Sequence, residues 1–164
     1  MEIEALLELM RNRRHNGRVK ADPIPDEHLK KILEAACWAP SGNNAQPWEF
    51  VVVKSAATKA QIREIMEGPA RPGSHGRAEA PVDPPVMIVV CGDTRLKESY
   101  PESVNRGEVF YSSLAAAIQN MHLAATALGL ATTWGTIREA SMAPLRQLLD
   151  LPEGLEIVAL VRGG

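Results

Sequence analysis

The chain has 164 residues, with 18 lysines and arginines against 20 aspartates and glutamates, which gives a formal net charge of −2. This length suits one domain over residues 1–164, and the charge balance gives no electrostatic reason to expect nucleic acid or an anionic membrane as a partner. Cys37 and Cys91 lie far apart without metal-ligand spacing, so neither a zinc site nor a disulfide framework is predicted. A reducing cytoplasm fits this cysteine usage best.

The amino-terminal residues predict an amphipathic helix. Apolar side chains recur there with the i, i+3, i+4, i+7 spacing of one helix face, at Ile3, Leu6, Leu7 and Met10. Acidic residues come first and basic ones last, which is the reverse of a secretory signal, and no run approaches the roughly 20 apolar residues that span a bilayer. We expect this helix to end near Asn16-Gly17, with Arg11, Arg13 and Arg14 at its C-terminal end.

A second predicted helix leads through an irregular loop into a strand. The helix begins after Pro25, with acidic residues in its first turn, and stops before Pro40. Residues 39–47, APSGNNAQP, are rich in proline, glycine and asparagine and must be irregular. Residues 48–53, WEFVVV, predict a strand in which the tryptophan belongs to the core.

The rest of the chain mixes helices, strands and loops. The patterns predict a helix over 56–67 capped by Ser55, then a long loop or lid over 68–85 and a strand over 86–91 that is covered on both faces. A polar loop over 94–106 leads to a predicted helix over 108–128, which Gly129 closes. An extended piece over 131–137, a helix capped by Ser141 and a last strand over 155–161 follow. Alanines keep much of the 108–128 helix small, which suits close approach of another backbone, in the core or across a subunit interface. Because no regular βαβ rhythm is present, an α+β fold with a central helix is favoured over a doubly wound one.

Most motifs of nucleotide binding and hydrolysis are missing. There is no G-x-G-x-x-G after a strand, no P-loop, no H-E-x-x-H and no G-x-S-x-G. Any nicotinamide or nucleotide must therefore bind by another route.

A basic cluster is the first candidate for binding chemistry. Arg13 and Arg14, followed by His15, place two permanently charged guanidinium groups at a helix end, where charge-assisted hydrogen bonds could hold a phosphate monoester. The helix dipole alone also favours basic residues in a last turn, so a solvated helix end is the alternative.

Two further segments are candidates for contact with a ligand. The irregular loop offers amides and backbone N–H groups that could match the edge of a heteroaromatic ring, from Ser41, Gly42, Asn43, Asn44 and Gln46. An ordinary helix-to-strand connection is the alternative, and both stay open. After the long helix, Trp134 is followed by Gly135, whose missing side chain would let the backbone approach a ligand. We interpret His28 and His122 as ordinary helix residues, and His75 lies in the long loop.

Taken in order, these segments resemble the nitroreductase family of FMN enzymes. Arg13-Arg14-His15 resembles the family's Arg-Arg-Ser start, and residues 35–48, with the pattern A-A-x-x-A-P-S-G-x-N-x-Q-P-W, are similar to its most diagnostic stretch. Residues 117–130 resemble the family's central helix, and residues 151–154 its turn into the last strand. The resemblance covers the chain from about Arg11 to the C-terminus.

The resemblance implies a nitroreductase-like α+β fold: a central mixed, mostly antiparallel sheet flanked by helices, with a long central helix through which two chains dimerise. It further implies a homodimer with FMN at the interface, NADH or NADPH as electron donor, and ping-pong hydride transfer through the flavin to a small flat acceptor such as a nitroaromatic or quinone. The implied cofactor-binding residues are Arg13, Arg14 and His15 at the phosphate and ribityl chain, Pro40, Ser41, Gly42, Asn44 and Gln46 at the isoalloxazine ring, mainly from the opposite subunit, and Trp134 and Gly135 near flavin N5. No metal and no general acid or base is assigned.

Three features depart from the family's pattern. His15 stands in place of its serine, Gly17 stands where a basic residue is usual, and the chain stops at Gly164, before an arm that in the family often adds a phosphate contact. Because each lost charge-assisted contact could cost ~1.5–3 kcal/mol, we expect weaker FMN binding. A different reaction on the same scaffold, reductive dehalogenation or flavin fragmentation, and a flavin-binding protein without turnover are the alternatives. No residue pattern identifies the acceptor or the preferred nicotinamide.

Overall fold

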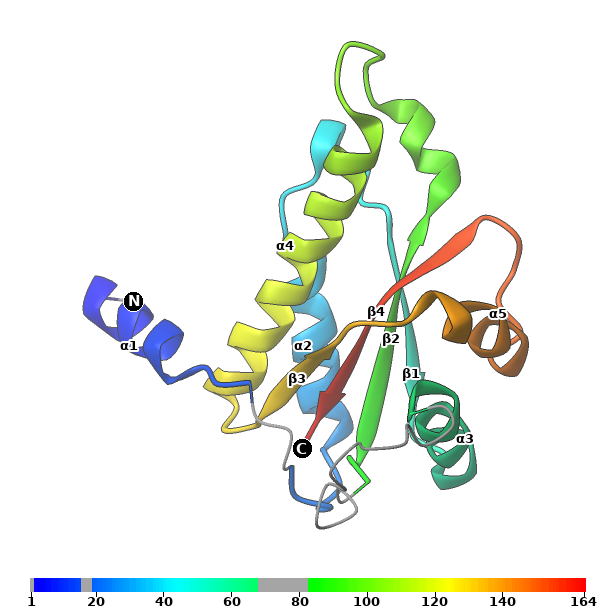
Figure 1. The fold of residues 1–164 in the computed structure, drawn as a ribbon. Helices are drawn as coiled ribbons and strands as arrows, with labels where there is room; N and C mark the ends of the chain where they lie inside the picture. Colours follow the sequence, from blue (N-terminus) through cyan, green and yellow to red (C-terminus); the bar gives the residue numbers. More distant parts are fainter. Residues whose placement is uncertain (1, 16–18, 68–82) are drawn as a thin grey trace, which may run out of the picture.

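The computed structural model describes residues 2–15, 19–67 and 83–164. Within them, a four-stranded sheet lies between two layers of helices (Figure 1). Its strands, in the spatial order β1-β2-β4-β3, are β1 (Trp48–Val53), β2 (Val86–Asp93), β4 (Leu155–Gly163) and β3 (Thr132–Gly135). Neighbouring strands are antiparallel, and an isolated parallel bridge joins His15 to Thr132. The predicted α+β class with a mostly antiparallel sheet is confirmed.

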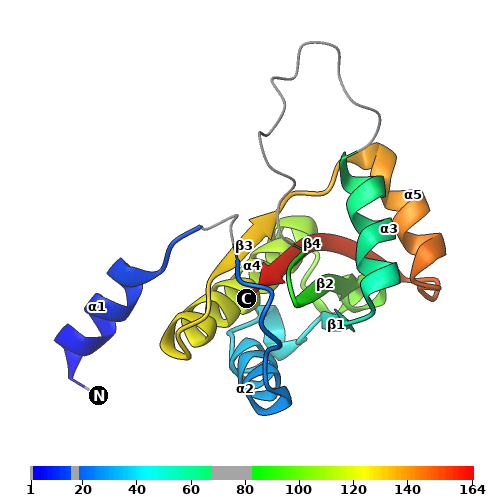
Figure 2. The same cartoon turned by 90° about the horizontal axis from the view of Figure 1, so that it is seen from below.

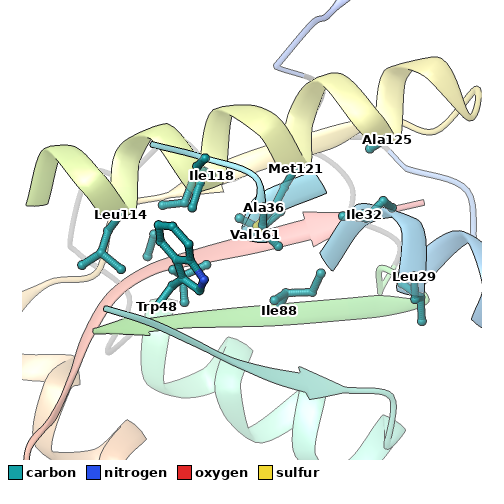
Figure 3. Packing of buried hydrophobic residues seen from close by; sticks show 14 of the residues in the cluster. Leu29, Ile32, Ala36, Trp48, Ile88, Leu114, Ile118, Met121, Ala125 and Val161 are labelled. Atoms are coloured by element: carbon teal, nitrogen blue, oxygen red, sulfur yellow. The ribbon is translucent and has the colours of Figure 1, made fainter. Parts of the chain in front are cut away.

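Helices α2 (Asp26–Cys37) and α4 (Arg106–Ala127) cover one face of the sheet. The buried residues of α4 recur every three or four positions, as the helical period requires, at Leu114, Ile118, Met121 and Ala125. They pack with Ile32 and Ala36 of α2 on the side chains of Ile88 and Val161 in the sheet (Figure 3). Trp48 is buried in the same cluster, which confirms its prediction as a core residue.

Helices α3 (Ala56–Glu67) and α5 (Glu139–Leu148) cover the other face. Because β2 is packed between the two layers, its residues are buried from Val86 to Gly92, as its unbroken apolar pattern predicted. The expected cap of α5 is wrong. Arg138 is the N-cap residue, and the Ser141 hydroxyl, inside the helix, donates a 3.0 Å hydrogen bond to the carbonyl oxygen of Ile65 near the end of α3.

Other helix boundaries follow local capping chemistry. The Ser55 side chain accepts from the Thr58 N–H at 3.3 Å, the Asn105 side chain accepts from the Glu108 N–H at 3.3 Å, and Gly129 follows α4 with a φ of +75°. The predicted polar loop over 94–106 instead begins with a 3₁₀ helix, Thr94–Ser99, because the Asp93 carboxylate caps its first turn. Residues 68–82 of the predicted long loop, with His75, lie outside the described residues.

Helix α1 (Ile3–Asn12) stands away from the rest of the described chain (Figure 2). None of its residues is buried, and Ile3 and Met10 of its apolar face are 62% and 45% exposed. It ends at Asn12, before the expected end near Asn16-Gly17, which lie outside the described residues. Among the helices that the structure describes, none combines the length and apolar character needed to cross a bilayer.

Candidate functional site

The basic cluster lies where α1 gives way to an extended segment beside β3. Arg13 caps α1, its N–H donating to the Leu9 carbonyl at 3.1 Å, and its own backbone is extended. Two residues later, His15 forms the parallel bridge to Thr132, the first residue of β3. The fold therefore brings the basic cluster next to the strand that carries Trp134 and Gly135. Arg14 and His15 are exposed, and Arg13 is half-buried.

Arg14 turns back onto the helix that precedes it. Its Nη1 donates to the carbonyl oxygen of Arg13 at 3.2 Å and to that of Arg11. This is the helix-capping role that a basic residue in a last turn commonly takes. The guanidinium group remains at the surface, where its other N–H groups can reach a bound anion.

Trp134 and Gly135 end the edge strand of the described sheet. Trp134 pairs with Val161 and is 37% exposed, so a large aromatic surface remains open beside the basic cluster. A Cβ atom at position 135 would lie 3.1 Å from the carbonyl oxygen of Leu160, which is closer than most Cβ contacts. The close packing of β3 on β4 is thus a structural reason for this glycine, beside the predicted approach to a ligand.

His122 joins this group, although the sequence pattern suggested an ordinary helix residue. It lies on α4, is 4% exposed, and places its Nδ1 2.6 Å from the hydroxyl oxygen of Thr132. Its ring centroid lies 6.1 Å from that of Trp134. Burial, followed by the nearby charges of Arg13 and His15, lowers the pKa of His122 to about 4. The imidazole is therefore neutral near pH 7.

The proline- and asparagine-rich loop lies elsewhere, against the N-terminal half of α4. The backbone N–H of Gly42 donates to the Ser113 hydroxyl oxygen at 3.1 Å, and the Asn43 side chain donates to the carbonyl oxygen of Ser99 at 2.8 Å. A Cβ atom at position 42 would lie 2.1 Å from Cγ1 of Val109, so a residue without a side chain is required there.

Left-handed backbone gives this loop its shape. Asn43 and Asn44 have φ of 53° and Gln46 has φ of 48°, a region in which asparagine is enriched among residues other than glycine. The Ser41 hydroxyl accepts from the Gln46 N–H at 3.0 Å, and the Gln46 amide donates to the Asn44 side chain at 3.1 Å. Pro40, Asn44 and Gln46 are exposed, so this network holds polar groups at the surface rather than in the core.

The two predicted halves of the site are separated along one helix. The loop contacts α4 at Ser113, whereas β3, which His15 bridges, contacts it at His122. Nine residues of α-helix rise about 13 Å. Figure 1 shows the loop near one end of α4 and the end of α1 near the other. Within one chain, the structure brings Arg13 and His15 together with β3, but it does not bring the loop to them.

Comparison with known proteins identifies the family. The family model described as "Nitroreductase family" matches residues 10–164. The chain belongs to the nitroreductase family. A protein of Archaeoglobus fulgidus provisionally named NADH dehydrogenase/NAD(P)H nitroreductase is 34% identical over 99% of this chain and 86% of its own length.

Solved nitroreductase structures have the same fold. A nitroreductase family protein from Clostridium novyi NT is 27% identical over 100% of this chain and 84% of its own, with a TM-score of 0.80. A protein from Desulfovibrio desulfuricans, provisionally assigned as a nitroreductase and solved in complex with FMN, is 31% identical over 97% of this chain and 84% of its own, with a TM-score of 0.77. The chain is also similar to 5,6-dimethylbenzimidazole synthase of Rhodospirillum rubrum, which is 28% identical over 96% of this chain and 78% of its own length.

Proposed function

We propose that this nitroreductase works as a homodimer that binds FMN between its subunits and passes a hydride from NADH or NADPH to a small flat acceptor, such as a nitroaromatic or quinone. The main support for this proposal is the separation of the basic cluster and the proline- and asparagine-rich loop along α4. The loop and β3, beside which the basic cluster lies, contact α4 about 13 Å apart, so the two groups lie at different ends of the helix within one chain.

A dimer with two-fold symmetry would bring the loop of one chain to the basic cluster of the other. If two α4 helices pack antiparallel about an axis that crosses them midway between positions 113 and 122, Ser113 of each chain lies at the level of His122 of its partner, so each loop lies at the same end as the other chain's basic cluster. The surface of α4 suits this arrangement, because small or uncharged side chains remain outside the core at Ser112, Ala115, Gln119 and Leu123. The exposed apolar face of α1 is a second surface that a partner would cover.

The chemistry of the described residues fits FMN. Arg13 and Arg14 supply positive charge for the phosphate and, with His15, N–H donors; Arg14 and His15 are exposed and Arg13 is half-buried beside β3. Pro40, Ser41, Gly42, Asn44 and Gln46 of the other subunit would contact the ring through backbone and amide groups. The Trp134-Gly135 backbone would lie near N5, where an N–H donor stabilises negative charge on the reduced ring.

FMN and the protein chain have different roles in the proposed reaction. When bound, FMN supplies the ring that accepts and donates the hydride. The chain then has to bind and orient this ring and leave one face open to nicotinamide and acceptor in turn. We assign no side chain as a general acid or base, since direct hydride transfer needs none.

The visible spectrum of the purified protein tests cofactor and donor. Protein as isolated, or after incubation with FMN, should show flavin absorbance, and anaerobic NADH or NADPH should bleach it. Sustained oxidation of the nicotinamide with a quinone or nitroaromatic should follow. A protein that takes up no FMN contradicts the proposal, and a flavin that neither nicotinamide reduces contradicts the assigned reaction.

Complementation between variants tests the shared site. Arg13→Ala/Arg14→Ala and Asn44→Ala/Gln46→Ala chains should each bind FMN poorly. Once subunits have exchanged, random pairing should restore about a quarter of the sites, because half of the dimers are mixed and each holds one intact site. Mixtures in which no flavin binding returns would show that one chain forms each site alone.

The similarity to 5,6-dimethylbenzimidazole synthase supports a second candidate reaction, fragmentation of the flavin by oxygen. Incubation of the reduced, FMN-loaded protein with oxygen, followed by product analysis, distinguishes this reaction from hydride transfer to an acceptor. Loss of the flavin with formation of a benzimidazole favours the second candidate, whereas reoxidised intact flavin favours the reductase.

A further inference from the structure

His122 is the point where three segments of the candidate site meet. Its ring projects from the buried face of α4, is hydrogen-bonded to the Thr132 hydroxyl at 2.6 Å, and lies beside the ring of Trp134. Thr132 in turn forms the bridge to His15. The buried imidazole and the buried hydroxyl therefore connect α4 to β3, and the bridge at the same Thr132 connects β3 to the segment after α1.

We propose that His122 is a positioning residue for the flavin site, which holds β3 and the His15 segment in their binding arrangement before FMN arrives. The inference rests on the proposed function, because the aligned groups are those assigned to the phosphate and to N5. Nothing in it requires His122 to touch the cofactor.

The environment of His122 explains why a hydrogen-bonding residue is needed there. β3 has only four residues, pairs with β4 on one side, and is joined to the His15 segment on the other by an isolated bridge. Such an edge has few bonds of its own to set its position. The bond from α4 to Thr132 adds a fixed point from the long, well-buried helix of the core.

The neutral state of the ring fits this role. A buried neutral imidazole makes its hydrogen bond to the hydroxyl without adding positive charge next to Arg13 and His15. The positive charges near the proposed phosphate site thus remain those of the exposed cluster, where an arriving anion can reach them.

Affinity measurements on the full-length protein, freed of flavin, separate positioning from simple structural support. If the His122–Thr132 bond only stabilises the fold, its loss weakens the flavin-free and flavin-bound forms equally, so the FMN dissociation constant stays the same. If the bond aligns the site, the flavin-free form relaxes without it, and the dissociation constant rises.

Three variants make the comparison. His122→Leu removes the bond at similar volume, His122→Asn retains a hydrogen-bonding group near the position of Nδ1, and Ile118→Val is a control in the core on the same helix. We expect His122→Leu to raise the FMN dissociation constant about tenfold, the amount that corresponds to one net hydrogen bond, while the other two stay within about threefold of wild type. Amide hydrogen exchange in β3 should accelerate in flavin-free His122→Leu and not in Ile118→Val.

The proposed function and the positioning role of His122 can fail independently of each other. Failure of the wild-type protein to bind FMN overturns the proposed function. Normal binding by the wild type, with the same dissociation constant and the same β3 exchange in His122→Leu and Ile118→Val, overturns the positioning role alone. Should His122→Leu fail to fold, Thr132→Val, which replaces the hydroxyl by a methyl group, takes its place in the same comparison.

Discussion

The backbone N–H of Gly42 donates a 3.1 Å hydrogen bond to the side-chain oxygen of Ser113, which lies on α4. Ser113 is buried, and its own hydroxyl donates to the Val109 carbonyl oxygen at 2.7 Å, so the hydroxyl proton is engaged and its lone pairs face the loop. This hydrogen bond, with the packing of Gly42 against Val109, holds the loop on the helix through which we propose that two chains dimerise.

Ser113→Ala should destabilise the protein by about 1–3 kcal/mol, because the partly buried Gly42 N–H loses its acceptor. FMN affinity should fall as well, because the loop is no longer held. Ser112→Ala is a matched control: Ser112 is exposed and donates only to the same Val109 carbonyl. Urea denaturation and FMN titration of both variants check this, and equal behaviour of the two would contradict the role of Ser113.

Gly42→Ala should cost about 1–3 kcal/mol through overpacking. The new methyl group would overlap Cγ1 of Val109, whose branched side chain has little rotamer freedom in a helix, and would crowd the Tyr100 ring at 3.1 Å. Gly107→Ala, at a helical position with space for a Cβ atom, should leave stability unchanged or raise it by up to about 1 kcal/mol. Denaturation midpoints give the comparison. A Gly42→Ala protein as stable as wild type would mean that the loop moves to accommodate the methyl group without loss of stability.

The double variant Arg13→Ala/Arg14→Ala should lose FMN while the fold survives. Arg14 is exposed and Arg13 only half-buried, so little core packing is removed, whereas two charge-assisted contacts to a phosphate would be lost. The FMN dissociation constant should rise about 100-fold or more. Flavin content, measured beside the circular dichroism spectrum, checks this prediction, with Arg11→Ala as the control. Unchanged flavin content in the double variant would remove these residues from the site.

Lys59→Met should destabilise the protein by about 1–3 kcal/mol. Lys59 is 7% exposed, and its Nζ donates to the carbonyl oxygens of Pro84 at 2.8 Å and Pro85 at 3.0 Å, which would both lose their donor. Lys54→Met removes an exposed lysine paired with Asp26 and should leave the denaturation midpoint nearly unchanged. Equal midpoints for the two variants would show that water replaces the Lys59 ammonium without cost.

His122 should make the protein lose stability as the pH falls from about 6.5 to about 4. In this window the unfolded chain takes up a proton on the imidazole and the folded chain does not, so unfolding becomes easier. The loss totals about 3 kcal/mol and is complete below the folded pKa. Asp26 and Asp93, whose pKa values are held below 3.8 by Lys54 and Arg95, add their loss only at still lower pH.

Denaturation of wild type and His122→Asn at a series of pH values measures this effect. The difference between the two free energies of unfolding should change across the window and be constant above it. A constant difference throughout would mean that the folded His122 titrates normally.

Local patterns were sufficient for most secondary structure. The apolar spacing along α4, the unbroken apolar run of β2 and the acidic start of α2 each depend on neighbouring residues, so they could be predicted without knowledge of the fold. The wrong cap of α5 came from a contact between distant segments. Ser141 resembles a helix cap locally, but the packing of α5 on α3 directs its hydroxyl to Ile65.

The amino-acid sequence by itself determined the α+β class, the basic helix end, the polar loop and the family resemblance, because each depends on residue type and short spacing. Only the tertiary structure decided that His15 lies beside Thr132, that the buried His122 is hydrogen-bonded to Thr132, and that the loop contacts α4 about 13 Å away. Chain topology brings residues more than 100 positions apart into contact, and no local periodicity records which ones.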